Sequence, residues 1–150
     1  MTPTVEQVRL AVERHCQFWN ERRQTDWAAL FAADVTFDDP VGSPTKHGAE
    51  AVRASWESSL TAGRTWHLVP TQIIVCADEA AVVMRNEGML HGCPVEIDSI
   101  EVWRVGADGL VRSVRAYFTP VAEVHTEYFA GDRPDEAPSA EPSSAVDSRR

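Results

Sequence analysis

The chain has 150 residues, enough for one domain with a substantial hydrophobic core. A hydrophobic content of 43% and a charged content of 25% are typical of a globular protein. The formal net charge of −9 argues against nucleic acid or an anionic membrane as a partner, because phosphate groups require a basic surface. No apolar run approaches the roughly 18 residues that a membrane-spanning helix needs.

Cysteine and histidine spacing narrows the chemistry further. Cys16, Cys76 and Cys93 are scattered without CxxC spacing, which predicts reduced thiols in a cytoplasmic protein. The N-terminal residues lack the cationic start and apolar stretch of a signal peptide. The five histidines show no H-x-H or HExxH spacing, so no metal site is predicted.

Helical periodicity marks the first part of the chain. Thr4 is placed to cap a helix that runs to about Arg22, with apolar residues along one face. Thr25 or Asp26 is expected to cap a short second helix with Phe31 on its inward side. A third helix is predicted over residues 49–62, ended by Gly63.

The hydrophobic period then changes from 3.6 to 2, which indicates strands. A short strand is predicted at residues 35–37, and four longer strands are predicted at residues 66–77, 80–91, 95–105 and 110–121. Helices followed by a run of strands indicate an α+β fold with an antiparallel sheet. We expect one domain over residues 1–130 and a disordered tail over residues 131–150, which has no aromatic residue.

Two adjacent carboxylates precede a proline directly after the short strand. Pro40 disfavours helical backbone at Asp39, and Gly42 permits a turn with positive φ. This backbone could hold a general base at a strand end. The alternative is a turn in which Asp38 and Asp39 are simply exposed to water.

A second carboxylate lies on an apolar strand face. Within residues 95–105, Glu101 shares its face with Ile97, Ser99 and Trp103. Burial there would raise the pKa of Glu101, because desolvation disfavours the charged form. The alternative is an ion pair with an arginine such as Arg112.

With these motifs in view, the sequence resembles ketosteroid isomerase, within the NTF2-like (SnoaL-like) superfamily. The resemblance covers about residues 5–122 and rests on two matching regions. The first runs from Arg14-His15 through Leu30-Phe31-Ala32-Ala33-Asp34 and Asp38-Asp39-Pro40-Val41-Gly42-Ser43 to Gly48, and the second includes Ile100-Glu101-Val102-Trp103-Arg104-Val105, Gly109, Ser113 and Arg115-Ala116. It implies a cone-shaped domain in which three helices pack on a curved sheet. The Asp-Pro turn also recurs in natural-product cyclases and polyether epoxide hydrolases of the superfamily.

The resemblance implies roles for three residues. Asp39 falls on the position of the aspartate that moves a proton between two substrate carbons. His15 falls on the position of a tyrosine, and Glu101 on that of a protonated aspartic acid, which together bind the enolate oxygen. Phe31 and Trp56 replace supporting tyrosines in some members, so the base is retained and the oxyanion hole is changed.

The resemblance further implies a hydrophobic pocket and a dimer. Residues expected to line the pocket, although core packing is an alternative for most of them, are Trp19, Trp27, Phe31, Phe37, Trp56, Met84, Asn86, Ser99, Trp103, Val114 and Phe118. Pairing through the outer sheet face would involve Asp98, Ile100, Val102 and Arg104.

Three functions remain in competition. The first is a cofactor-independent steroid isomerase-like enzyme acting on a hydrophobic polycyclic or polyketide-like substrate. The second is a cyclase or epoxide hydrolase of the same superfamily. The third is a dimer that binds small molecules without turnover.

Overall fold

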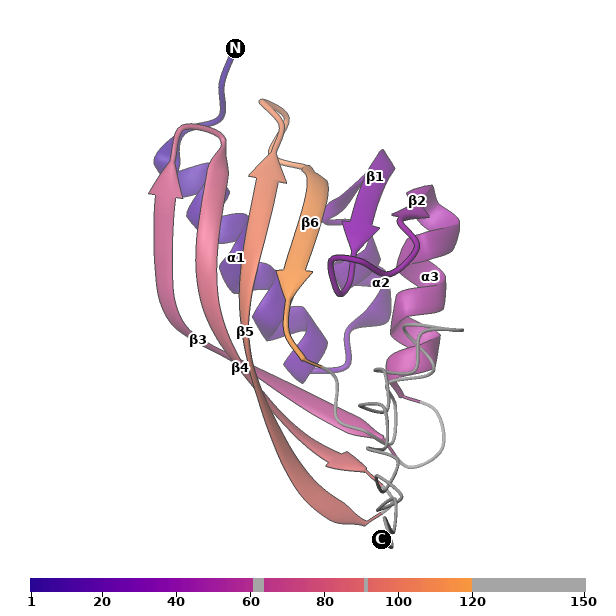
Figure 1. Ribbon diagram of the computed structural model, residues 1–150. Helices are drawn as coiled ribbons and strands as arrows, with labels where there is room; N and C mark the ends of the chain where they lie inside the picture. Colours follow the sequence, from indigo (N-terminus) through magenta and orange to yellow (C-terminus); the bar gives the residue numbers. More distant parts are fainter. Residues whose placement is uncertain (61–63, 91, 120–150) are drawn as a thin grey trace, which may run out of the picture.

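The computed structural model describes residues 1–60, 64–90 and 92–119. Its elements confirm an α+β fold in which three helices pack on a curved sheet (Figure 1). The predicted domain end at residue 130, the 131–150 tail and the helix stop at Gly63 lie outside the described residues. None of the described helices is long and apolar enough to cross a bilayer.

Helix α1 spans Val5–Asn20 and begins at the predicted cap. The Thr4 side chain accepts from the Gln7 amide at 3.1 Å, and the Gln7 side chain accepts from the Thr4 amide at 2.8 Å. This reciprocal capping box satisfies two amide groups that a helix start leaves unpaired. The apolar face of α1, which includes His15, packs on the sheet.

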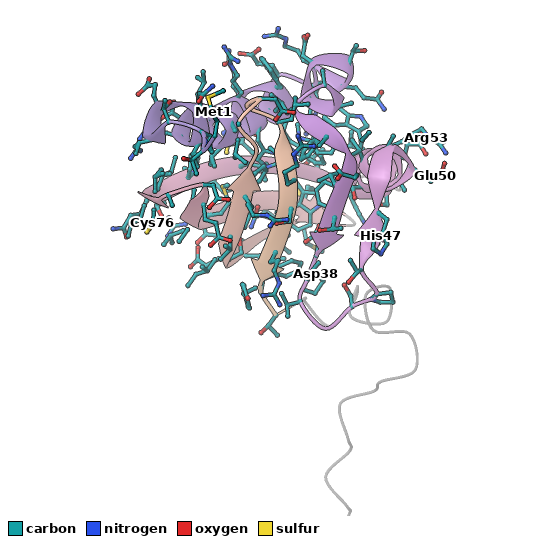
Figure 2. All side chains as sticks on the ribbon, turned by 90° about the horizontal axis from the view of Figure 1, so that it is seen from above. Met1, Asp38, His47, Glu50, Arg53 and Cys76 are labelled. Carbon is teal, nitrogen blue, oxygen red and sulfur yellow. The ribbon has the colours of Figure 1, made fainter. Side chains whose placement is uncertain are left out.

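The second and third helices differ in detail from the prediction. Helix α2 spans Gln24–Ala28 and starts after Arg23, which makes no side-chain cap, so neither Thr25 nor Asp26 is its N-cap. Phe31 belongs to a strand and not to α2, because backbone pairing with a distant strand extends to that point. Helix α3 spans Gly48–Ser59. Its Arg53 and Glu50 form an ion pair on the outer side of the domain (Figure 2).

The sheet has six strands in the order β2-β1-β6-β5-β4-β3. They are β1 (Phe31–Asp38), β2 (Lys46–His47), β3 (Thr65–Cys76), β4 (Glu79–Leu90), β5 (Cys93–Val105) and β6 (Val111–Tyr117). All neighbours are antiparallel except β1 and β6, which are parallel. The expectation of a purely antiparallel sheet is therefore wrong, since the long path from β1 to β6 permits a parallel pair.

The long strands bend around α1 (Figure 1). The register shifts between Pro70 and Gln72 in β3, and between Arg104 and Val105 in β5. Such irregularities bend a strand and increase its twist. One face of the sheet is thus concave toward the helices, and buried residues of β4 such as Val82 and Met84 alternate with exposed ones.

The end of α1 is tied to β3 by one side chain. Asn20 donates to the Leu68 carbonyl at 2.9 Å and accepts from the Leu68 amide at 2.8 Å. The Asn20 side chain therefore bonds the backbone groups of Leu68 that a neighbouring strand would otherwise pair with. Trp19 adds a bond from its indole nitrogen to the Trp66 carbonyl at 3.0 Å. These bonds set the distance between α1 and the sheet edge.

We expect Asn20→Ala to lower the free energy of unfolding by about 1–3 kcal/mol, because Leu68 would lose both partners. Urea denaturation measures the change. Gln17→Ala is the matched control, since it removes an exposed hydrogen bond to Glu21 on the same helix. An equal loss in both variants would contradict a specific role for Asn20.

Candidate active site

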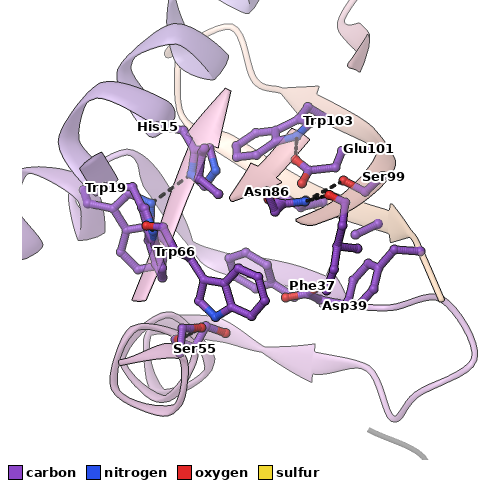
Figure 3. A pocket seen from close by; sticks show the side chains of 17 residues that line it. His15, Trp19, Phe37, Asp39, Ser55, Trp66, Asn86, Ser99, Glu101 and Trp103 are labelled. Atoms are coloured by element: carbon purple, nitrogen blue, oxygen red, sulfur yellow. Dashed lines mark hydrogen bonds between the residues drawn. The ribbon is translucent and has the colours of Figure 1, made fainter. Parts of the chain in front are cut away.

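A cavity of about 130 Å³ opens between the helices and the concave face of the sheet (Figure 3). Its wall is largely aromatic, with a few polar groups that reach it from α1, α3, the end of β1 and the sheet. The lining residues are His15, Trp19, Trp27, Phe37, Asp39, Ser55, Ser59, Trp66, Leu68, Asn86, Ile97, Ser99, Glu101, Trp103, Val114, Ala116 and Phe118. An apolar cavity with few polar groups is the usual form of a small-molecule site.

The two adjacent aspartates have different environments. Asp38 closes β1 and accepts from Arg115 at 3.1 Å and from Thr45, so its carboxylate is already paired. These bonds, led by that from Thr45, lower the pKa of Asp38. Asp39 lines the cavity and has no hydrogen-bond partner within residues 1–60, 64–90 and 92–119. Of these two aspartates, Asp39 is the one placed to act on a molecule in the cavity.

The backbone after Asp39 is held by several bonds. The Asp39–Pro40 peptide bond is cis, and Gly42 has a φ of 98°, as its predicted turn requires. The Val41 amide donates to the Ala116 carbonyl of β6 at 2.8 Å. The Ser43 amide and hydroxyl both donate to the Pro40 carbonyl. This turn fixes the direction from which Asp39 enters the cavity.

His15 is buried among aromatic rings, and its ring centre lies 4.5 Å from that of Trp103. Desolvation lowers the pKa of His15 from 6.5 to about 3, so the imidazole is neutral near pH 7. The Trp27 indole donates to its Nδ1 atom at 2.9 Å. The described residues contain no hydrogen bond between His15 and Glu101, so the two do not form an ion pair.

Glu101 comes from the cavity-facing side of β5, as predicted. Desolvation raises its pKa from 4.5 to about 7, a hydrogen bond from Trp103 opposes this rise, and the charge of Asp39 adds to it. Arg112 is not its partner, because that side chain pairs with Asp34 at 3.1 Å and Asp108 at 2.6 Å. Trp103 donates to Glu101 at 2.8 Å instead.

The two cavity carboxyls are suited to different protonation states. Desolvation raises the pKa of Asp39, but the ammonium group of Lys46 opposes this rise. Among the described residues no cation acts on Glu101 in this way, and the charge of Asp39 adds to the rise in its pKa. The neighbouring charges therefore favour the ionised form of Asp39 and the protonated form of Glu101. Two neighbouring carboxyl groups cannot both ionise easily, and such pairs often provide one acid and one base.

A polar pair lies on the sheet floor of the cavity, where the sequence predicted extra polar groups. Asn86 donates to the Ser99 hydroxyl at 3.2 Å and to the Ile97 carbonyl at 3.1 Å (Figure 3). Both amide protons of Asn86 are used, so its oxygen and the Ser99 proton remain for a ligand.

The aromatic predictions for the pocket wall are met in part. Trp19, Trp103, Val114 and Phe118 line the cavity, as do Trp27 and Phe37. Phe31, Trp56 and Met84 do not, and they lie in the buried core behind the wall. This difference is physical: alternation along a strand or helix selects the inward side, but not whether an inward ring meets a cavity or another ring.

Sequence reasoning missed the lining residues of β3 and α3. Trp66 and Leu68 line the cavity because β3 bends toward α1. Ser55 lies on the inward side of α3, one residue before Trp56, and its buried hydroxyl has no partner within the described ranges. Ser59, one turn later, donates to the Ser55 carbonyl at 2.8 Å. The one signal in the sequence was the four-residue spacing of Ser55 and Ser59, which places both hydroxyl groups on the same face of a helix.

No group of three or more histidine, cysteine, aspartate or glutamate side chains that could hold a metal occurs among residues 1–60, 64–90 and 92–119. The three cysteines are free thiols; Cys16 is buried, whereas Cys76 and Cys93 are exposed. Burial raises the pKa of the Cys16 thiol, which makes it a poor nucleophile.

The SnoaL-like domain model matches residues 12–114, which is more than half of the chain. The chain belongs to the SnoaL-like domain family. Among curated proteins, a steroid Delta-isomerase of Nocardioides simplex is 29% identical over 93 residues, which cover 62% of this chain and 74% of that protein.

Two solved structures share the fold of this SnoaL-like domain. One is an epoxide hydrolase/cyclase-like enzyme of pyran ring formation in the polyether salinomycin, with a TM-score of 0.70 and 22% identity over 76% of this chain and 92% of that chain. The other is a Mycobacterium tuberculosis protein in complex with estradiol-17beta-hemisuccinate, with a TM-score of 0.66 and 22% identity over 75% of this chain and 94% of that chain.

The raised pKa of Glu101 in this SnoaL-like domain predicts a pH-dependent stability. Because the folded state binds this proton more tightly than the unfolded state, the stabilisation is complete below about pH 4.5 and is lost as pH rises through about 7. We expect Glu101→Gln to gain stability relative to the wild type across this interval. Urea denaturation at each pH measures the difference.

Glu87→Gln is the control for that measurement, because Glu87 is an exposed glutamate on the adjacent strand β4. The free energy of unfolding of Glu101→Gln, relative to the wild type, should change with pH, and that of Glu87→Gln should not. A pH-independent difference for Glu101→Gln, or the same pH dependence in both variants, would show that Glu101 is not desolvated.

Proposed function

We propose that this SnoaL-like domain is a cofactor-independent acid–base enzyme that moves a proton on carbon next to a carbonyl. Its substrate would be a hydrophobic polycyclic or polyketide-like molecule. The observation that carries the proposal is one cavity lined by three groups: Asp39, which has no hydrogen-bond partner within the described residues, the neutral His15, and Glu101, whose pKa burial raises to about 7. A distant steroid Delta-isomerase relative supports the same chemistry.

The proposed reaction uses these three groups in turn. The Asp39 carboxylate takes a proton from the carbon next to the carbonyl, and the electron pair of that bond moves toward the carbonyl oxygen. His15 and protonated Glu101 donate hydrogen bonds to the resulting enolate oxygen. Asp39 then returns the proton to another carbon of the conjugated system. The aromatic wall excludes water and strengthens each of these interactions.

A β,γ-unsaturated ketosteroid in D₂O is a direct probe of this mechanism. Deuterium that exchanges onto Asp39 during turnover should enter the product at the carbon of the conjugated system that receives the returned proton. Asp39→Asn should slow turnover by about 10²–10⁴-fold, since it removes a general base. Asp38→Asn is the matched control, because the adjacent carboxylate is paired with Arg115 on the surface and an exposed ion pair contributes only about 0–1 kcal/mol.

The same variants separate catalysis from binding. Equilenin, a phenolic steroid that resembles the enolate, should bind more tightly to Asp39→Asn, whose neutral amide mimics the protonated base. Turnover of the ketosteroid within threefold of wild type in Asp39→Asn would refute proton transfer by Asp39. Tight binding of equilenin without turnover in any variant would favour a non-catalytic small-molecule-binding protein.

Epoxide opening and cyclisation is the second candidate function. Protonated Glu101 could donate to the leaving epoxide oxygen while ionised Asp39 takes a proton from the attacking hydroxyl group, so that one C–O bond forms as another breaks. The pairing of an acid and a base in one cavity favours this candidate, as does the fold shared with the polyether enzyme. Deuterium exchange next to a ketone distinguishes the two, because epoxide opening does not require it.

We also propose that the domain forms a homodimer through the outer face of the sheet and resides in the cytoplasm. Three exposed apolar residues, Val83, Ile100 and Tyr117, lie in register across β4, β5 and β6. A row of this kind is typical of an interface. The free thiols support a reducing compartment.

The dimer is tested by light scattering coupled to size-exclusion chromatography. Ile100→Asp should convert a dimer into a monomer, because the charge would lie in the centre of the row. Val5→Asp is the control, since Val5 is equally exposed but lies on α1. A monomeric wild-type protein at tens of micromolar would contradict the proposal.

A further inference from the structure

Two buried tryptophans that also line the cavity donate hydrogen bonds to the two proposed oxyanion donors. The Trp27 indole nitrogen donates to His15 Nδ1 at 2.9 Å, and the Trp103 indole nitrogen donates to Glu101 Oε2 at 2.8 Å (Figure 3). The tryptophans are only 2% and 1% exposed. A buried indole N–H requires an acceptor, so loss of either pair would leave an unsatisfied group in the core.

The bond from Trp27 decides where His15 carries its proton. A neutral imidazole holds one proton, on Nδ1 or on Nε2. Because Nδ1 accepts from Trp27, a proton on that atom would meet the indole N–H, and the proton must lie on Nε2. The Nε2 atom has no partner within the described residues and is not enclosed by protein, so its N–H is directed to the cavity that His15 lines.

The bond from Trp103 likewise determines which oxygen of Glu101 carries the proton. When this carboxyl is protonated, the proton can occupy either oxygen. Oε2 accepts from the Trp103 indole, which leaves Oε1 as the favoured carrier of the proton. Trp103 also packs against the His15 ring, with 4.5 Å between ring centres, so one side chain orients both groups.

We propose that Trp27 and Trp103 are positioning residues that direct His15 Nε2–H and Glu101 Oε1–H toward one ligand oxygen. Each indole occupies one polar atom of its partner, and the other polar atom has no partner within the described residues. The site would therefore select a ligand with a single strong acceptor oxygen, such as an enolate or a phenolate. This ligand preference rests on the proposed function, whereas the proton positions do not.

The tautomer of His15 is measured by ¹⁵N-resolved NMR of the full chain, in which couplings to the ring protons identify the protonated nitrogen. His15→Gln assigns its signals among those of the five histidines. We expect the wild type to show only the Nε2–H form, and Trp27→Phe to show a mixture of both forms. An unchanged tautomer in Trp27→Phe would overturn the proposal for Trp27.

Trp56→Phe is the matched control. Trp56 belongs to the same ring cluster, with its ring centre 5.3 Å from that of Trp27, but it makes no bond to His15. The tautomer should remain Nε2–H in this variant. If Trp27→Phe does not fold, benzothienylalanine at position 27 keeps the shape of the indole and replaces its N–H by sulfur, and it should give the same mixture.

Trp103→Phe tests the second pair. The bond from Trp103 lowers the pKa of Glu101, so its loss should move the carboxyl titration to higher pH. Carbon-13 NMR of labelled glutamate follows this titration, and Glu101→Gln assigns the signal. A titration that stays at the wild-type pH would overturn the proposal for Trp103.

Equilenin binding connects both tests to the ligand. Trp27→Phe should weaken equilenin binding by about 10–100-fold, which is the usual effect of losing a residue that orients a ligating group. Trp56→Phe should leave equilenin binding unchanged. A shifted tautomer with unchanged equilenin affinity would overturn the ligand preference. A fixed Nε2–H tautomer in an enzyme that turns over no ketosteroid would refute the proposed function and leave the role of Trp27 standing.

Discussion

Two carboxyl groups, Asp39 and Glu101, are desolvated in one cavity between the helices and the sheet, and the surrounding elements are arranged around them. A carboxylate is costly to bury without a partner, yet Asp39 has no hydrogen-bond partner among the described residues and Glu101 has only an indole. The bend of the sheet, the rings of α1 and α2 and the fixed turn after β1 hold these groups in place. Selection for stability alone would favour pairing these two carboxyl groups or replacing them with other side chains.

The contrast between Asp38 and Asp39 shows how one backbone turn separates a paired surface acid from an acid that lines the cavity. Successive side chains of a strand point to opposite faces. Asp38 reaches Arg115 and Thr45 on the outside, and Asp39 reaches the cavity. The outer pairs anchor the end of β1, while the inner carboxylate keeps the raised pKa that suits a base.

In the proposed reaction, a histidine in the place of the tyrosine that the resemblance implies changes how the donor is controlled. A tyrosine has one hydroxyl proton, which can rotate to a partner. A neutral imidazole has one N–H whose position depends on the bond to its other nitrogen. In this chain that bond comes from Trp27, and burial keeps the ring neutral. In the proposed site, indole N–H groups take the place of the hydroxyl network that Phe31 and Trp56 cannot provide.

Local periodicity and turn chemistry predicted the order of the three helices and of every strand except β2, together with the inward face of β5 and the turn that carries Asp39. The sequence also placed His15, Asp39 and Glu101 together through family resemblance. Contacts between distant segments were needed to establish that β1 and β6 run parallel, that Phe31 lies in a strand and that Phe31, Trp56 and Met84 fill the core. The tertiary structure also revealed the bonds from Trp27 and Trp103. Such features depend on contacts between distant segments, and no local pattern encodes which buried ring meets the cavity.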